Sequence, residues 1–313
     1  MIINPFQPFI ESQGFVLLDG AMGTYLEAKG LNLNSTLWSA KILEEKPSLI
    51  KNVHRDYLEA GAEIITTSGY QASMQGLTKF GFSEEQSINL IHKTIDLAFE
   101  ARNELMMEDS QMTPYPLIAA SIGPYGAFLA NGSEYHGNYR VSFKEIMDYH
   151  RKNIKILAYT KTDLLAFETI PSLQEGEAII EVLTEFPDLK AWISFSCQNG
   201  DLVSYGESFS KVVEKMEKSP NIMAIGINCT APKYIESLLK LAHRKTEKIL
   251  MAYPNKGNIY DSQTKSWTRA NVDLNLRDLV KIWYQAGARI IGGCCGIHPP
   301  DIREIGQALK EIM

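Results

Sequence analysis

Residues 222–255, IMAIGINCTAPKYIESLLKLAHRKTEKILMAYPN, decide how this chain folds. The stretch begins and ends with short, almost continuously apolar runs, Ile222–Cys229 and Ile249–Asn255, and between them apolar residues recur at helical spacing near 232–243. Continuous rather than alternating apolarity is typical of strands buried on both faces, as in a parallel sheet. The stretch therefore predicts a strand, a helix and a second strand parallel to the first.

The same unit recurs along the rest of the chain. Eight β-rich runs occur in order, at Phe15–Gly20, Glu63–Tyr70, Leu117–Pro124, Leu164–Ile170, Lys190–Cys197, Ile222–Cys229, Ile249–Asn255 and Arg289–Gly296. Amphipathic stretches separate or follow them, near 47–58, 84–105, 142–161, 172–185, 207–217, 232–243, 276–283 and 300–312. Eight strand–helix units in series predict an α/β fold, a single closed (β/α)8 TIM barrel. Its C-terminal face would carry three long connections, 24–46, 125–141 and 256–272.

A doubly wound open sheet is the alternative fold. That fold usually has fewer strands and often a glycine-rich turn of the form GxGxxG after the first strand, and this sequence contains no such turn. The closed barrel is therefore favoured.

Length and composition agree with one barrel domain spanning 1–313. The chain is 45% hydrophobic with no biased tract, which is ordinary for a globular protein. Its net charge of −6 comes without a basic stripe, which argues against nucleic-acid and anionic-membrane partners. The N-terminus lacks a signal-peptide pattern, and no apolar run approaches the roughly 18 residues that span a bilayer. We therefore expect a cytoplasmic protein.

Three of the four cysteines lie at predicted strand ends. Cys229 closes the sixth strand, and Cys294 and Cys295 lie in the eighth, so that Cys229 and Cys294 are 65 positions apart. Barrel closure would bring these thiols to one face, where they would form a zinc site with bonds of about 2.3 Å. The alternatives are buried cysteines that pack as small hydrophobes, or a vicinal disulfide. Cys197, at the end of the fifth strand, is either a fourth ligand or, as we favour, a bystander.

Five segments of the sequence match a known family. They are Leu18–Thr24 (LDGAMGT), Glu63–Ser68 (EIITTS), Phe167–Thr169 (FET), Gly226–Cys229 (GINC) and Gly292–Pro299 (GGCCGIHP). The chain thereby resembles the homocysteine S-methyltransferases, a barrel family that includes the betaine- and S-methylmethionine-using enzymes and the first module of cobalamin-dependent methionine synthase. The likeness runs from about Leu17 to Pro299, and the GINC and GGCCG pair is its most specific part.

The resemblance implies that Cys229, Cys294 and Cys295 bind a catalytic zinc ion, Zn2+, and that the sulfur of homocysteine takes its fourth position. The chemistry agrees, because only a thiolate attacks carbon quickly and zinc stabilises a bound thiolate at neutral pH. A methylated sulfonium or ammonium donor leaves as a neutral molecule. Positioning the reacting groups is then the main task of the protein.

The resemblance also implies which residues bind the amino-acid part of homocysteine. Asp19 and Glu168 match the positions that receive its α-amino group, although ordinary loop or cap carboxylates look the same in a sequence. The backbone of Gly20, Ala21 and Met22 would meet its carboxylate. Asn228 either orients Cys229 through a hydrogen bond or satisfies backbone groups.

The methyl donor is a separate question. We expect no cobalamin or folate module after the barrel and no C-terminal extension like that of the betaine enzyme, which favours free S-methylmethionine, with S-adenosylmethionine as a substitute. A sulfonium benefits from an aromatic face, for which Trp38 and Tyr70 are candidates, although aromatic residues in loops more often serve packing. Other hypotheses are a methyltransferase for selenocysteine or another thiol, a non-catalytic barrel that binds zinc and a thiol amino acid, and a zinc hydrolase. A hydrolase would want histidine or carboxylate ligands.

Overall fold

The computed structural model describes residues 4–33, 38–109, 113–257, 259–261, 266–268 and 275–313, and of residues 38–40, 259–261 and 266–268 the backbone alone. Its centre is one sheet of eight parallel strands in the order β1-β10-β7-β6-β5-β4-β3-β2. The strands are β1 (Val16–Leu17), β2 (Ile64–Thr66), β3 (Leu117–Ile122), β4 (Leu164–Ile170), β5 (Ala191–Phe195), β6 (Ile222–Asn228), β7 (Ile249–Tyr253) and β10 (Ala288–Ile291). A parallel bridge between Leu18 and Ile64 joins the two edges. The predicted (β/α)8 barrel is confirmed, and the open doubly wound sheet is excluded.

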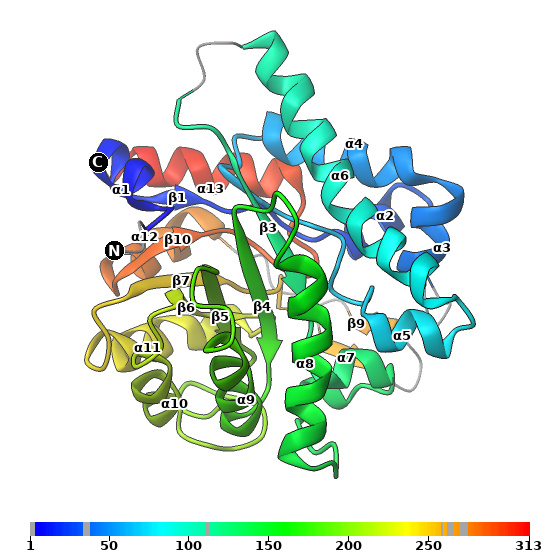
Figure 1. Cartoon of the computed structure of the whole chain (residues 1–313). Helices are drawn as coiled ribbons and strands as arrows, with labels where there is room; N and C mark the ends of the chain where they lie inside the picture. The colour runs from blue at the N-terminus through cyan, green and yellow to red at the C-terminus, as the bar shows by residue number, and fades with distance from the viewer. Residues whose placement is uncertain (1–3, 34–37, 110–112, 258, 262–265, 269–274) are drawn as a thin grey trace.

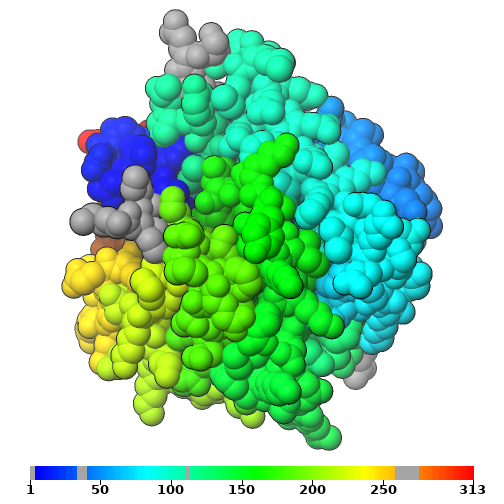
Figure 2. Space-filling view, in the orientation of Figure 1, coloured from blue at the N-terminus to red at the C-terminus, as the bar shows by residue number. Residues whose placement is uncertain are grey.

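Helices lie on the outside of the barrel between successive strands (Figure 1). The principal ones are α4 (Pro47–Glu59), α6 (Glu84–Glu108), α8 (Phe143–Leu157), α9 (Leu173–Leu183), α10 (Phe209–Met216), α11 (Pro232–His243), α12 (Leu276–Gln285) and α13 (Pro299–Lys310). They coincide with the amphipathic stretches predicted from the sequence. In the space-filling view the chain passes around the molecule in order, from blue through cyan and green to yellow (Figure 2). Among the helices that the structure describes, none is long and apolar enough to cross a bilayer.

The connections that the sequence analysis treats as loops contain short elements. The additional ones are α1 (Gln7–Gln13), α2 (Gly23–Ala28), α3 (Trp38–Glu45), α5 (Met74–Lys79), α7 (Tyr125–Leu129), the 3-10 helix η1 (Ser133–Tyr135) and the hairpin β8 (Ile259–Asp261) with β9 (Ser266–Thr268). These pieces are too short to show an apolar periodicity in sequence. Apart from α1, they thicken the C-terminal face of the barrel.

Most of the predicted strands run past the observed ends. The eighth was expected to reach Gly296, whereas β10 ends at Ile291, and the first was expected to reach Gly20, whereas β1 ends at Leu17. The residues beyond these ends remain small or apolar because they line a buried mouth, so composition does not mark where the backbone leaves the sheet. The difference matters because the candidate site residues lie in these final turns.

The sheet separates two apolar layers. Alternate strand residues such as Val16 and Leu18 belong to an inner cluster, whereas Leu17 packs outward against the helices. Phe6 and Phe9 join the inner cluster from the segment of α1. Because α1 directly precedes β1, it lies at the N-terminal end of the barrel, which leaves the C-terminal end for the site.

Candidate metal centre

The sulfurs of Cys229, Cys294 and Cys295 meet just beyond the C-terminal ends of β6 and β10. The Sγ atoms of Cys229 and Cys295 lie 3.8 Å apart, those of Cys294 and Cys295 3.9 Å, and those of Cys229 and Cys294 2.6 Å. All three residues are partly exposed. The prediction that these cysteines converge on a position that could hold a metal ion is confirmed.

The cluster has the dimensions of a tetrahedral zinc site. Zinc–sulfur bonds of about 2.3 Å give sulfur–sulfur edges of about 3.8 Å. Two of the three separations match that edge, and a side-chain rotation at Cys229 or Cys294 would widen the third. Three sulfur ligands leave a fourth side open, which is typical of a catalytic rather than a structural zinc site.

These thiols are difficult to ionise without a cation. The adjacent Cys229 sulfur, followed by burial and the charge of Glu168, raises the pKa of the Cys294 thiol well above its usual range. Like charges at this separation cannot all form unless a cation lies between them. The three sulfur atoms therefore suit a thiophilic metal ion, and all-sulfur tetrahedral sites are typical of zinc.

Backbone geometry brings the sulfurs together. Cys229 has a φ of 47°, in the left-handed region that non-glycine residues seldom adopt, so the chain turns sharply after β6. Gly292 allows the segment after β10 to pass close to β1, because a Cβ there would lie 2.7 Å from the carbonyl oxygen of Asp19. The amide of Cys294 donates to the carbonyl of Pro254 at 2.8 Å. This bond connects the segment between β10 and α13, residues 292–298, which we call the metal loop, to the end of β7.

Asp19 lies beside the metal loop and is 4% exposed. Its carbonyl oxygen accepts a hydrogen bond from the amide of Gly293 at 3.0 Å. Its carboxylate accepts hydrogen bonds from the amide of Thr66 at 2.7 Å and from the Thr66 hydroxyl at 3.1 Å. Burial raises the pKa of Asp19 well above its usual range; the amide of Thr66 opposes this shift and the charge of Glu168 adds to it.

Glu168, in the C-terminal part of β4, is the second buried carboxylate and is 9% exposed. The hydroxyl of Ser121 donates to its Oε1 at 2.5 Å, and the hydroxyl of Tyr253 also donates to it. Burial raises the pKa of Glu168 to about 7, against the lowering effect of the two hydrogen bonds. Within the described residues, no lysine, arginine or histidine forms an ion pair with Asp19 or Glu168. Two buried carboxylates without a counter-ion favour binding of a cation.

Asn228 holds the backbone next to Glu168. Its Oδ1 accepts a hydrogen bond from the amide of Thr169 at 2.8 Å, and its Nδ2 donates to the Thr169 hydroxyl at 2.8 Å. The hydroxyl of Ser194 donates to the same Oδ1 at 3.0 Å. These partners come from β4 and β5, so the described hydrogen bonds of the Asn228 side chain are with Thr169 and Ser194 rather than with Cys229.

The turn Gly20–Met22 is fixed against the metal loop. The amide of Ala21 donates to the carbonyl of Ile297 at 3.0 Å, and the hydroxyl of Tyr57 donates to the carbonyl of Ala21 at 2.8 Å. A Cβ on Gly20 would lie 2.5 Å from the Ile297 carbonyl oxygen, so only glycine fits there. The amide of Ala21 is thus already used inside the protein.

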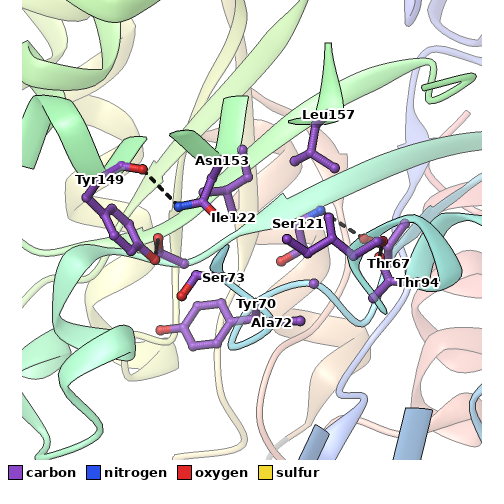
Figure 3. A pocket seen from close by; sticks show the side chains of 13 residues that line it. Thr67, Tyr70, Ala72, Ser73, Thr94, Ser121, Ile122, Tyr149, Asn153 and Leu157 are labelled. Carbon is purple, nitrogen blue, oxygen red and sulfur yellow. Dashed lines mark hydrogen bonds between the residues drawn. The ribbon is translucent and has the colours of Figure 1, made fainter. Parts of the chain in front are cut away.

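Tyr70, which follows β2, lies at the edge of the mouth. The hydroxyl of Thr169 hydrogen-bonds it, and burial followed by the charges of Glu134 and Cys229 raises the pKa of Tyr70 well above its usual range. Tyr70 also lines a small pocket between β2, β3, α6 and α8 (Figure 3). Ser121 lines the same pocket and donates to Glu168, so Ser121 lies between the pocket and that carboxylate.

Two predicted residues remain outside this arrangement. Trp38 begins α3, but its side chain lies outside the described residues. Cys197 is not one of the three clustered cysteines; its side chain is buried, and its amide donates a hydrogen bond to the hydroxyl of Thr230 at 2.9 Å.

The residues that hold the two carboxylates and Asn228 were not predicted from the sequence. Thr66 and Tyr253 are the last residues of β2 and β7, and Ser121 and Ser194 are the second-last residues of β3 and β5. All four are polar residues at the C-terminal ends of otherwise apolar strands. That position in a barrel is the signal by which they could have been found.

Known proteins share both the sequence and the fold. Residues 16–309 match the homocysteine S-methyltransferase family. The chain is 45% identical over 312 residues to Homocysteine S-methyltransferase YbgG of Bacillus subtilis, with 99% of each chain covered. It is 42% identical over 306 residues to Homocysteine S-methyltransferase 1 of Arabidopsis thaliana, with 95% of this chain and 94% of that protein covered.

A solved structure agrees with these relatives. The metallated form of the homocysteine methyltransferase MmuM from Escherichia coli superposes with a TM-score of 0.88 at 41% identity, with 99% of this chain and 100% of that chain covered. The resemblance that the sequence motifs indicate is confirmed. The chain belongs to the homocysteine S-methyltransferase family.

Proposed function

We propose that the protein methylates homocysteine to methionine, with the homocysteine thiol held by a zinc ion on Cys229, Cys294 and Cys295. The observation that carries this proposal is a three-sulfur cluster, open on its fourth side, beside two buried carboxylates that have no basic partner among the described residues. Homocysteine is complementary to both parts, because it offers a thiol and an ammonium group. The names of the relatives and the metallated form of MmuM support the proposal.

The protein side chains would bind and orient the substrate. When bound, zinc would keep the homocysteine thiol ionised at neutral pH. Asp19 and Glu168 would accept hydrogen bonds from the ammonium, and their burial strengthens that attraction by excluding water. Because the Ala21 amide is already bonded, we expect the amides of Gly20 and Met22 to meet the substrate carboxylate.

The donor that we propose is S-methylmethionine, with S-adenosylmethionine as a substitute. The thiolate sulfur attacks the methyl carbon, the bond between that carbon and the donor sulfur breaks, and its electron pair stays on the donor sulfur. One S-methylmethionine and one homocysteine thiolate thus give two molecules of methionine. A mouth that contains three cysteine sulfurs and two carboxylates favours a cationic donor, and Tyr70 offers a sulfonium an aromatic face.

Metal analysis and a donor screen test this function. We expect the purified protein to contain about one zinc per chain and to lose activity when a chelator removes it. S-methylmethionine, S-adenosylmethionine and betaine are then compared as donors to homocysteine, and selenocysteine is compared as an acceptor by kcat/KM. A protein with less than about half an equivalent of zinc that is insensitive to chelator would contradict the zinc proposal.

A further inference from the structure

The connection between β3 and α8 contains a buried carboxylate that the proposed reaction has not used. Glu134, in η1, is 9% exposed, and its Oε2 has no hydrogen-bond partner among the described residues. Burial raises the pKa of Glu134 to about 7, although the amides of Glu134 itself and Gly132 donate to the carboxylate and oppose the shift. A buried carboxylate oxygen without a partner is unfavourable unless a ligand completes it.

The connection holds Glu134 in a fixed position. A single buried carboxylate, Glu175, accepts hydrogen bonds from the amide of Tyr125 at 2.6 Å and from the hydroxyl of Tyr139 at 2.7 Å. These two residues lie near the opposite ends of the connection. Gly126 lies directly against η1, because a Cβ there would be 2.4 Å from the amide nitrogen of Glu134. The placement of Glu134 is therefore built into the fold rather than left to a free loop.

Glu134 shares its neighbours with the metal site. Its charge acts on the hydroxyls of Tyr70 and Tyr135, and the Tyr135 hydroxyl is also influenced by the charges of Cys229 and Cys295. Among the described residues, burial and two backbone amides shift the pKa of Glu134, and no lysine, arginine or histidine does so. Glu134 is thus an anionic group at the edge of the same mouth, without a cation of its own.

We propose that Glu134 binds the α-ammonium group of an amino-acid methyl donor, beside Tyr70 and Tyr135. This inference rests on the proposed function, in which Asp19 and Glu168 already serve the ammonium of homocysteine. The α-ammonium is the appropriate partner because it keeps its charge throughout the reaction. The sulfonium loses its charge during transfer, so a carboxylate held against it would stabilise the reactants more than the transition state.

The test compares Glu134→Gln, Glu134→Asp and the exposed control Asp201→Asn, which removes one charge from the loop between β5 and α10. For Glu134→Gln we expect the KM of S-methylmethionine to rise roughly 10- to 100-fold, with kcat and the KM of homocysteine nearly unchanged. Glu134→Asp should retain part of the affinity, and Asp201→Asn should match the wild type. Calorimetric titration with S-methylmethionine provides the same comparison without turnover.

Two further readouts separate binding from a structural role. Because the ionised carboxylate is buried and incompletely bonded, Glu134→Gln should melt at the wild-type temperature or above it, whereas loss of a structural residue would lower it. Dimethylsulfoniopropionate, a sulfonium without an α-ammonium, should bind the wild type and Glu134→Gln equally. An equal loss of affinity for both sulfonium compounds would place Glu134 on the sulfonium and overturn the inference.

The outcomes distinguish this inference from the function on which it rests. If the wild type methylates homocysteine from S-methylmethionine and Glu134→Gln does so with an unchanged donor KM, only the role of Glu134 is overturned. If the wild type neither binds S-methylmethionine nor uses it, both the proposed donor and the proposed role of Glu134 are contradicted. A donor KM that rises together with a lowered melting temperature would also overturn it, in favour of a structural role.

Discussion

The side-chain amide of Asn228 clamps Thr169 with two hydrogen bonds of 2.8 Å. Its Oδ1 accepts one from the Thr169 amide, and its Nδ2 donates the other to the Thr169 hydroxyl. Thr169 needs such a clamp because its φ is 61°, a conformation that is strained for a β-branched residue. Thr169 directly follows Glu168. Asn228, from β6, therefore holds the turn that orients a carboxylate on β4.

Replacement of Asn228 by Ala should release this turn. The change removes three buried hydrogen bonds and leaves the Thr169 amide without its partner, so we expect the free energy of unfolding to fall by about 2–4 kcal/mol. Because Glu168 loses its fixed orientation, the KM of homocysteine should rise about 10-fold or more. Denaturant titration and steady-state kinetics measure the two effects.

Asn221→Ala is the matched control for that substitution. Asn221 is also buried, and its side chain donates to the carbonyls of Phe186, Pro187 and Leu189, away from the mouth. It should lose a similar amount of stability and keep the wild-type KM. Equal KM values for the two variants would show that Asn228 contributes to stability alone.

The raised pKa of Glu168 predicts a pH dependence of stability and of binding. The folded-state pKa of about 7 exceeds the ordinary value of 4.5. This difference adds about 3 kcal/mol to the free energy of unfolding at low pH, relative to high pH. The contribution is fully present below the unfolded-state pKa and is lost as the pH rises through about 7. The metal-free, substrate-free protein should therefore be less stable at pH 8 than at pH 5, by chemical denaturation.

Glu168→Gln isolates that contribution. The variant should show a smaller loss of stability between pH 5 and pH 8, since its side chain cannot ionise. In the active protein, the KM of homocysteine should fall as the pH rises from 6 to 8, because the ionised Glu168 attracts the ammonium, and this component should vanish in the variant. Identical pH profiles for wild type and variant would contradict the role of Glu168.

The barrel and the cluster of three cysteines could be predicted from the sequence for a common physical reason. Strands buried on both faces are continuously apolar, so the eight runs are visible without any knowledge of contacts. Cys229 and Cys294 terminate two such runs, and barrel topology brings parallel strand ends to one face. The prediction needed only the order of the elements.

The support of the carboxylates could not be predicted in the same way. Ser121 and Tyr253 contact Glu168 from strands that are distant in sequence, and a serine or tyrosine at a strand end is not unusual by itself. Glu134 was overlooked because its burial depends on the fold of a connection, in which Gly126 packs against η1. Gly292 contributes through the absence of a Cβ, because a Cβ would lie 2.7 Å from the carbonyl oxygen of Asp19, and this close approach depends on the fold.

Gly292→Ala should therefore disturb the metal loop directly. The new Cβ would lie 2.7 Å from the carbonyl oxygen of Asp19, and a backbone shift that relieves this contact should cost about 1–3 kcal/mol of stability. Zinc affinity should fall as well, because Cys294 moves with the loop. Gly81→Ala is the control: its φ of 104° is strained for alanine, but no atom lies within 4 Å of the new Cβ. It should lose stability and keep its zinc.

Cys294→Ala and Cys197→Ala together test which thiols hold the metal. The sulfur of Cys294 lies within 4 Å of both other sulfurs of the cluster, so its removal leaves two ligands and should weaken zinc binding by more than about 100-fold. That loss exceeds the roughly 10- to 100-fold expected when only a hydrogen bond to a metal ligand is removed.

Cys197 is buried and stands apart from that cluster, so Cys197→Ala should retain its zinc and lose only the packing of one sulfur. The metal content of the two dialysed proteins, measured by atomic absorption, decides between them. Zinc retained by Cys294→Ala and lost by Cys197→Ala would transfer the ligand role to Cys197. That exchange is difficult to reconcile with the structure, because Cys197 would have to leave the apolar core that surrounds it before its sulfur could approach Cys229.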